Sequence, residues 1–136
     1  MIPGILEKMV LDTADSRGAL LVGKDGMAIH WLVVDEVADA EECAAWTPAL
    51  FEQTCRMMAN SLGGPPLQIT VQTESLAYLI RPIGPDYLVA MLMDPEGDLK
   101  AAGATMKQRA ADLAAELDVP MNFAMSEAAP PEVPAG

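Results

Sequence analysis

The chain has 136 residues, of which 51% are hydrophobic and 21% are charged. This length and balance predict one folded domain with a core of its own and argue against a disordered chain. The 20 acidic and 8 basic residues leave a formal net charge of -12, which repels phosphate backbones and anionic membrane surfaces. We therefore expect no nucleic acid and no membrane among the partners.

The N-terminal residues and the cysteines bear on where the protein works. Pro3, Gly4 and Glu7 interrupt the apolar run that a signal peptide needs, and no stretch reaches the roughly 18 apolar residues of a membrane span. Cys43 and Cys55 belong to no CxxC or Cys/His cluster, which is typical of buried thiols in a reducing compartment. We expect a cytoplasmic protein.

The first third of the chain predicts a helix followed by a hairpin. Apolar residues at helical spacing predict an amphipathic helix over residues 3–14, with Pro3 in its first turn. After a break at residues 15–18, apolar runs at 19–22 and 27–34 predict two strands. Asp25 and Gly26 lie between them and are typical of a tight turn between twisted strands.

A long middle helix follows an acidic stretch. Asp39 and Glu42 have the spacing of a capping box, and Gly63 with Gly64 indicates a stop. Pro48 leaves two alternatives open, a new helix capped by Thr47 or one long helix kinked at the proline. The apolar surface spans two adjacent stripes, so we expect two partners, the sheet and a second subunit. These stripes are Phe51, Cys55, Met58 and Leu62, and beside them Leu50, Thr54, Met57 and Ser61.

Residues 67–93 predict a meander of three strands. Alternation over residues 67–73 predicts a half-buried strand, and a second strand runs from Leu76 to Ile80, where Arg81 and Pro82 interrupt it. The third run, residues 87–93, has almost no polar member, which predicts a strand covered on both faces at the deepest place in the sheet.

The last predicted element is a helix that Asp98 caps and that ends near Asp118, with Gly103 as its weak point. Residues 119–136 are acidic and rich in Pro and Ala, so we expect a flexible tail after a domain at 1–118. The order α-β-β-α-β-β-β-α predicts an α/β, or α+β, fold. It is a three-layer sandwich in which the terminal helices cover one face of a five-stranded antiparallel sheet and the middle helix covers the other.

The residues give no indication of catalytic chemistry. His30 is the only histidine and lies in mid-strand, so no Ser/His/Asp arrangement or His-rich metal site can form within one chain. The carboxylates fall in turns or on helix surfaces, and Gly23 with Gly26 belongs to a hairpin, which is the wrong context for phosphate binding. Five of the ten methionines fall on predicted core or interface positions, namely Met57, Met58, Met91, Met93 and Met106. We expect no enzyme, no cofactor and no metal.

Four stretches together resemble the Roadblock/LC7 family, and within it the MglB-like bacterial regulators of Ras-like small GTPases. They are RGALLVGKDGMAIHWLVV, the middle helix ending in SLGG, LQITVQTESLAYLIRPIGPDYLVAMLM, and DLKAAGATMKQRAADLAAEL. Each stretch is only moderately specific, and their order and spacing carry the resemblance over residues 2–117. Profilin-like and longin-like folds share part of this architecture.

The resemblance implies a homodimer that regulates a GTPase. Such proteins pair their middle helices antiparallel and join the edge strands that follow, here residues 49–62 and 67–73. The implied dimer interface is Phe51, Cys55, Met58, Leu62, Leu67, Ile69 and Val71. A Ras-like small GTPase would dock on the paired helices, and the outward polar residues Glu52, Gln53, Arg56 and Asn60 are the candidates for its contact surface. In MglB-like members this contact stimulates GTP hydrolysis by rearranging the switch regions of the GTPase. The interruption at Pro48 departs from an unbroken middle helix.

Two other functions fit the residues. One is a small-molecule sensor, with methionines lining an adaptable pocket between the layers. The other is a subunit that dimerises a larger complex without touching a GTPase. Binding of a nucleotide-loaded GTPase would distinguish a GTPase regulator from a subunit that only dimerises a complex. A ligand that raises the melting temperature would favour the sensor.

Overall fold

The computed structural model describes residues 1–118, and the tail predicted at 119–136 lies outside the described residues. Within residues 1–118 the elements follow the predicted order. They are α1 (Ile2–Leu11), β1 (Ser16–Gly23), β2 (Ala28–Val33), the single 3-10 turn η1 (Val34–Glu36), α2 (Ala40–Met58), β3 (Ile69–Gln72), β4 (Ala77–Ile83), β5 (Tyr87–Met93) and α3 (Leu99–Leu117).

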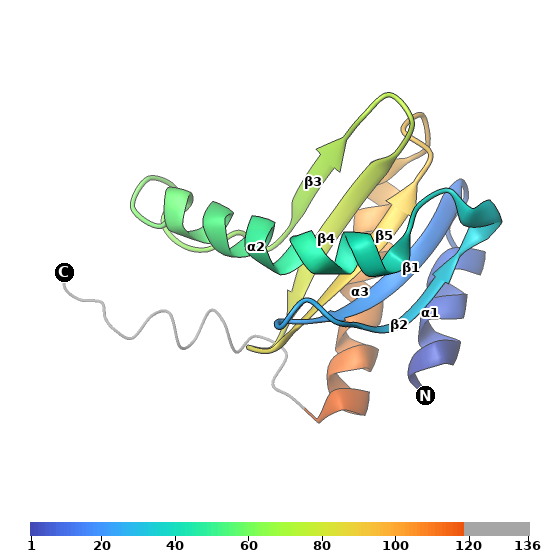
Figure 1. Ribbon diagram of the computed structural model, residues 1–136, viewed down its shortest axis with the longest axis horizontal. Helices are drawn as coiled ribbons and strands as arrows, with labels where there is room; N and C mark the ends of the chain where they lie inside the picture. The colour runs from blue at the N-terminus through green and yellow to red at the C-terminus, as the bar shows by residue number, and fades with distance from the viewer. Residues whose placement is uncertain (119–136) are drawn as a thin grey trace.

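The strands form one antiparallel sheet in the order β2-β1-β5-β4-β3 (Figure 1). The prediction that the most apolar strand lies deepest is confirmed, because β5 is central and is buried from Leu88 to Met93. Ala90 of β5 pairs with Leu20 of β1 on one side and with Ile80 of β4 on the other. β2 and β3 are the two edges of the sheet.

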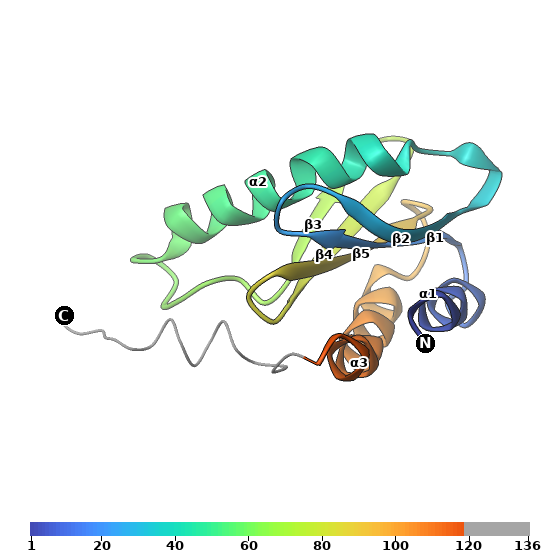
Figure 2. The same ribbon diagram turned by 60° about the horizontal axis from the view of Figure 1, so that its bottom comes forward.

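The helices cover both faces of the sheet, as predicted. Figure 2 shows α1 and α3 beneath one face and α2 above the other. Because neighbouring strand residues point to opposite faces, Leu21 and Met91 join the core under α1 and α3, whereas Leu20 and Ala90 join the core under α2. The three-layer sandwich is therefore confirmed.

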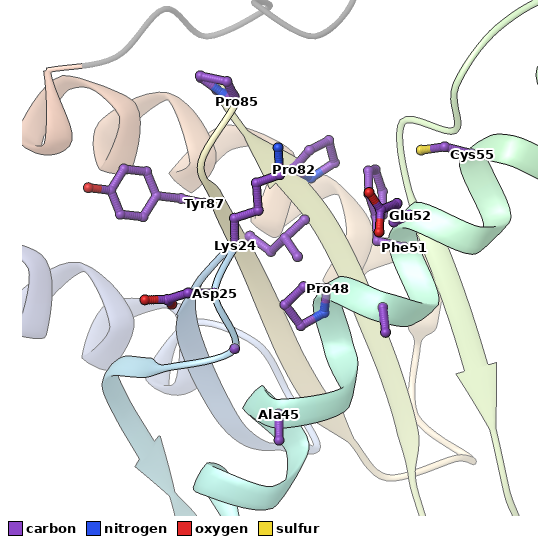
Figure 3. A pocket seen from close by; sticks show the side chains of 14 residues that line it. Lys24, Asp25, Ala45, Pro48, Phe51, Glu52, Cys55, Pro82, Pro85 and Tyr87 are labelled. Atoms are coloured by element: carbon purple, nitrogen blue, oxygen red, sulfur yellow. The ribbon is translucent and has the colours of Figure 1, made fainter.

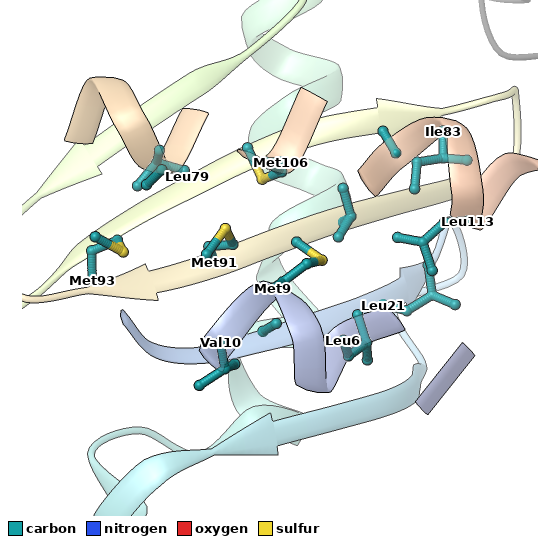
Figure 4. Packing of buried hydrophobic residues seen from close by; sticks show 14 of the residues in the cluster. Leu6, Met9, Val10, Leu21, Leu79, Ile83, Met91, Met93, Met106 and Leu113 are labelled. Carbon is teal, nitrogen blue, oxygen red and sulfur yellow. The ribbon is translucent and has the colours of Figure 1, made fainter. Parts of the chain in front are cut away.

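The core between the sheet and the two terminal helices is the larger one (Figure 4). Leu6 and Met9 of α1 meet Met106 and Leu113 of α3 there, and all four side chains are fully buried. Burying a side chain of this size stabilises the folded state by about 1.5–3 kcal/mol. The methionines of this core fill space, whereas Met57 of α2 is 78% exposed and is no core residue.

Strand β4 continues through two residues that we expected to interrupt it. It includes Arg81 and Pro82, and Pro82 pairs with Leu88 of β5. Pairing with β3 stops at Ile80, so beyond that residue β4 has a neighbour on one side only. A strand tolerates proline where no neighbour needs its missing N–H group, which explains why the expected interruption was wrong.

Other boundaries differ by a few residues from the sequence prediction. β1 begins at Ser16 instead of Ala19, because Ser16 and Gly18 still pair with β5. A Cβ atom on Gly18 would lie 2.8 Å from the carbonyl oxygen of Leu32, so glycine lets β2 approach closely there. α1 ends at Leu11 instead of residue 14, and β3 is shorter at both ends than the predicted 67–73.

Helix α3 has the predicted cap and end. The side chain of Asp98 accepts a hydrogen bond from the amide of Ala101 at 3.0 Å, and Asp118 adopts the left-handed conformation at the C-terminus. Gly103, the expected weak point, is buried, and a Cβ atom there would lie 3.0 Å from the side-chain nitrogen of Gln68. The glycine thus makes room for the segment that leads into β3. Among the described helices, none is long and apolar enough to cross a membrane.

Candidate protein-interaction surface

The first half of α2 is anchored on the sheet. Asp39 caps the helix, since its side chain accepts hydrogen bonds from the amides of Glu41 at 3.0 Å and Glu42 at 3.2 Å. Ala40, Ala44 and Thr47 are the buried residues of the helix, and all three lie in its first eight positions. The helix packs there against β1 and β2.

The helix runs through Pro48 without a break, so of the two alternatives the single long helix is the observed one. Pro48 has no N–H group to donate to the carbonyl of Ala44, four residues earlier. The hydroxyl of Thr47 donates to the carbonyl of Cys43 at 2.6 Å, and it lies 2.7 Å from the hydroxyl of Tyr78 on β4. Thr47 is therefore no N-cap, and its side chain ties the helix to the sheet beside the proline.

An aromatic pair completes this anchor. The ring of Trp46 lies 5.0 Å from the ring of Tyr78 at an angle of 52°, a tilted arrangement that aromatic rings favour. Burial raises the pKa of Tyr78, and the hydrogen bond with Thr47 opposes this only in part. The phenol therefore stays protonated at neutral pH.

The second half of α2 projects past the edge of the sheet (Figure 1). No residue from Pro48 to Met58 is buried. Residues three or four apart share one helix face, so Phe51, Cys55 and Met58 continue the face that Ala44 and Thr47 bury. All three are half-buried, because the sheet that covers the first half of the helix ends beneath them.

The structure brings together only part of the implied dimer interface. Phe51, Ile69 and Val71 pack against the core under α2, whereas Cys55 and Met58 lie outside that cluster on the projecting half of the helix. Leu62 and Leu67 are 68% and 49% exposed in the segment between α2 and β3.

The helix ends earlier than we expected, so Leu62 of one predicted stripe and Ser61 of the other lie beyond it. It stops at Met58, and the amides of Ser61 and Leu62 both bond to the carbonyl of Met58. Leu62 was wrongly placed on the helix. The backbone turns away before Gly63 and Gly64, which have φ angles of +81° and +148° that suit glycine.

The candidate partner-binding residues all point to solvent. Glu52, Gln53 and Arg56 are exposed on the helix, and Asn60 is exposed in the turn after it. Arg56 lies 3.5 Å from Glu52 as an exposed ion pair. Such a pair contributes about 0–1 kcal/mol, so it leaves Arg56 available to another carboxylate.

A cleft of about 490 Å3 opens between α2 and the turns at one end of the sheet. Figure 3 shows Pro48 and Phe51 of α2 on one side of the cleft and Pro82 of β4 on the other, and the lining is mostly apolar. Sequence reasoning missed this cleft because its residues come from three distant segments. In the sequence, the prolines that line the cleft indicate only turns and the ends of strands. Polar groups occur at Lys24, Asp25 and Glu52.

The remaining chemistry-bearing residues do not converge. His30 is exposed on the edge strand β2. Burial raises the pKa of the Cys43 thiol, with Glu42 and Asp39 adding to the effect, and burial together with Glu52 raises the pKa of the Cys55 thiol. Within residues 1–118, no group of His, Cys, Asp and Glu side chains is arranged to hold a metal ion.

The architecture matches several solved structures, although the sequence matches no protein-family model and no curated protein. A Roadblock/LC7 domain from Streptomyces avermitilis superposes with a TM-score of 0.77 over 86% of this chain and 98% of its own, at 19% identity. The protein has the Roadblock/LC7 fold.

Two further Roadblock/LC7-like structures are MglB proteins. MglB of Myxococcus xanthus has a TM-score of 0.76 at 13% identity and covers 86% of this chain and 94% of its own. A structure described as MglB with tetrameric arrangement has a TM-score of 0.74 at 17% identity, covering 82% and 84%. The Roadblock/LC7 resemblance of the sequence is thus confirmed at the level of fold.

Proposed function

We propose that the protein is a homodimeric regulator or scaffold without catalytic chemistry of its own, which binds a Ras-like small GTPase and stimulates its GTP hydrolysis. The observation that carries this proposal is the projecting half of α2, which presents the same helix face as the anchored half but has no sheet beneath it. The Roadblock/LC7 fold and its MglB neighbours support the same reading.

The position of α2 relative to the edge strand β3 supports the proposed dimer. The free edge of β3 can pair with β3 of a second copy by antiparallel backbone hydrogen bonds. A helix that overhangs β3 then lies above the sheet of the partner. Phe51, Cys55 and Met58 would be covered there, and Leu67, Ile69 and Val71 would lie at the seam between the two sheets.

The GTPase would contact the outer side of the two helices. Glu52, Gln53, Arg56 and Asn60 are all exposed, and they lie outside the face of Phe51, Cys55 and Met58 that the dimer would cover. Arg56 serves in this proposal as a contact at the rim, since its side chain is exposed and its ion pair with Glu52 is too weak to withhold it from a partner. Acceleration of hydrolysis would arise from reshaping the GTPase.

The test is binding and single-turnover hydrolysis with a Ras-like small GTPase encoded in the same genome, loaded with a non-hydrolysable GTP analogue or with GDP for the binding assay. We expect binding that prefers the GTP form, and a loss of about tenfold or more for Arg56→Glu. The matched control is Lys107→Glu, which makes the same charge change on the exposed face of α3 and should leave binding unchanged. Equal loss in both variants, or no preference between nucleotides, would contradict the proposal. Binding of the GTPase without faster GTP hydrolysis would indicate a scaffold and not an activator.

The cleft supports a second candidate function. Its volume of about 490 Å3 and mostly apolar lining fit a small ligand, although no methionine is among the residues that line it, contrary to the sensor hypothesis. A ligand held there would contact α2 beside Pro48 and could shift the helix. Screening small apolar molecules for a rise in the melting temperature tests this function, and the rise should vanish in Ala49→Trp, which fills the cleft.

A further inference from the structure

The edge strand β2 has one register irregularity, at Ile29 opposite Leu21 and Val22, but otherwise lacks the features that usually protect a sheet edge. Natural edge strands carry lysines, prolines or inward-pointing charges that prevent further strands from pairing with them. β2 reads AIHWLV and contains no proline, no glycine and no formally charged side chain at pH 7. It pairs with β1 alone, so its outer backbone groups face outward without a neighbouring strand.

Apolar side chains stand exposed on both faces of β2. Trp31 pairs with Leu20 and so lies on the face of α2, whereas Leu32 pairs with Ala19 and lies on the face of α1 and α3. Ile29, Trp31 and Leu32 are 36%, 48% and 38% exposed. An extended chain laid along this edge would gain backbone hydrogen bonds and cover apolar surface on both sides.

Carboxylates mark both ends of this strand. Asp25 precedes it in the hairpin turn, and Asp35 and Glu36 follow it in η1. Asp35 and Glu36 have φ angles of +55° and +52°, a conformation that Asp tolerates but that is uncommon for Glu36. Such backbone strain tends to occur at functional sites. Arg17 forms an ion pair with Asp35 at 3.9 Å, but the Asp35 side chain is 81% exposed, so this pair is weak and leaves the acidic end available.

Two occupants from this chain itself fit poorly. An antiparallel pair of β2 strands would bring Asp25 of each copy next to Asp35 and Glu36 of the other, between chains that each carry a net charge of -12. The tail at residues 119–136 contains two glutamates, no lysine or arginine, and prolines that cannot donate to a strand ladder.

We propose that the β2 edge binds an extended segment of a partner protein in which apolar residues alternate with lysine or arginine. The segment adds a sixth strand beside β2, with its basic side chains at Asp25 and at Asp35–Glu36. β2 and β3 are opposite edges of the sheet (Figure 1), so the site stays open in a dimer paired through β3 and does not depend on that dimer.

The test uses the fluorescent peptide KVTVKVTVK and measures its anisotropy with the full chain. We expect saturable binding that weakens by about tenfold or more for the charge-reversed peptide EVTVEVTVE. The peptide KVTPKVTVK, whose proline lacks a backbone donor, should weaken to a similar extent. Amide exchange measured by NMR should slow at residues 28–33 when KVTVKVTVK binds. Exchange that slows elsewhere and not in β2 would overturn the proposal.

Variants separate this edge from the rest of the surface. Trp31→Lys places a cation on the edge and should abolish binding, and the double variant Asp35→Asn with Glu36→Gln keeps the strand and should weaken binding several-fold. The matched control Met57→Lys puts the same charge on the projecting half of α2 and should bind the peptide like the wild type. Equal binding of the basic and acidic peptides, or unchanged binding by both edge variants, overturns the proposal. If the wild-type protein has a solution mass above that of a dimer, and Trp31→Lys lowers this mass, the edge binds a second copy of the chain instead.

Discussion

The two halves of α2 share one helix and one periodicity but differ in what covers them. From Ala40 to Thr47 the inward residues are small and buried, which lets the helix lie close to β1 and β2. From Pro48 to Met58 the same face carries Phe51 and Met58, and no residue is buried. The first half therefore contributes to the stability of one chain, whereas the second half has its apolar surface available for association.

The largest expected effect is the loss of the proposed dimer when the second half of α2 is altered. Met58→Asp places a charge at the centre of the proposed interface, where an unpaired carboxylate is costly to bury, and should raise the dimer dissociation constant by about 100-fold. Sedimentation analysis measures this constant. Gln53→Asp adds the same charge on the outward side and should leave a dimer. A wild type that is monomeric at high concentration would contradict the helix-pairing geometry.

The next effect concerns the stability contributed by the first half. Ala44→Met inserts a long side chain where no part of Ala44 is exposed, which should lower the free energy of unfolding by about 1–3 kcal/mol. Urea denaturation followed by circular dichroism measures the change. The neighbouring Ala45 is exposed, so Ala45→Met should stay within about 0.5 kcal/mol of the wild type. Equal losses at both positions would show that the helix does not pack as described.

A smaller effect tests the bond that links α2 to the sheet beside Pro48. Tyr78→Phe removes the hydroxyl that meets Thr47 and should cost about 1 kcal/mol of unfolding free energy at pH 7. Thr47 keeps its bond to the carbonyl of Cys43, so the loss stays modest.

The same substitution predicts a pH dependence. Burial raises the pKa of Tyr78 above its ordinary value of 10.0, so the folded state holds the phenolic proton more tightly than the unfolded state does. This contribution to stability is fully present below pH 10.0 and is lost as the pH rises from there toward the folded-state pKa. The stability difference between wild type and Tyr78→Phe should therefore shrink above that pH. A difference that grows with pH would reverse the sign of the argument.

The smallest expected effect is a difference in alkylation rate between two cysteines, one in each half of α2. The raised thiol pKa values make both cysteines slow to alkylate near pH 8. Raising the protein concentration through the dimer dissociation constant should slow the alkylation of Cys55 several-fold further and leave the rate at Cys43 unchanged. Mass spectrometry after timed iodoacetamide treatment reports both sites. Parallel slowing at both cysteines would place the contact elsewhere.

The element order and the depth of β5 were predictable from sequence because apolar runs and turn residues are local signals. The ends of elements were less predictable, since Ser16, Arg81 and Pro82 join strands only because a neighbouring strand is there to pair with them. The apolar face of α2 was visible in its periodicity. The cleft was not, because distant segments build it. The positive φ angles of Asp35 and Glu36 also leave no pattern in the sequence.

The pairing of β1 with β5 has a consequence for how the chain folds. β1 and β2 meet across one tight turn, and β4 and β5 meet across another, so both contacts can form early. The central ladder joins Ser16–Gly23 to Tyr87–Met93, and the whole middle of the chain must be brought round before a single one of its hydrogen bonds can form. The sheet is thus two locally formed pieces closed by one long-range seam. Substitutions along that seam should slow refolding more than equally buried substitutions near either turn.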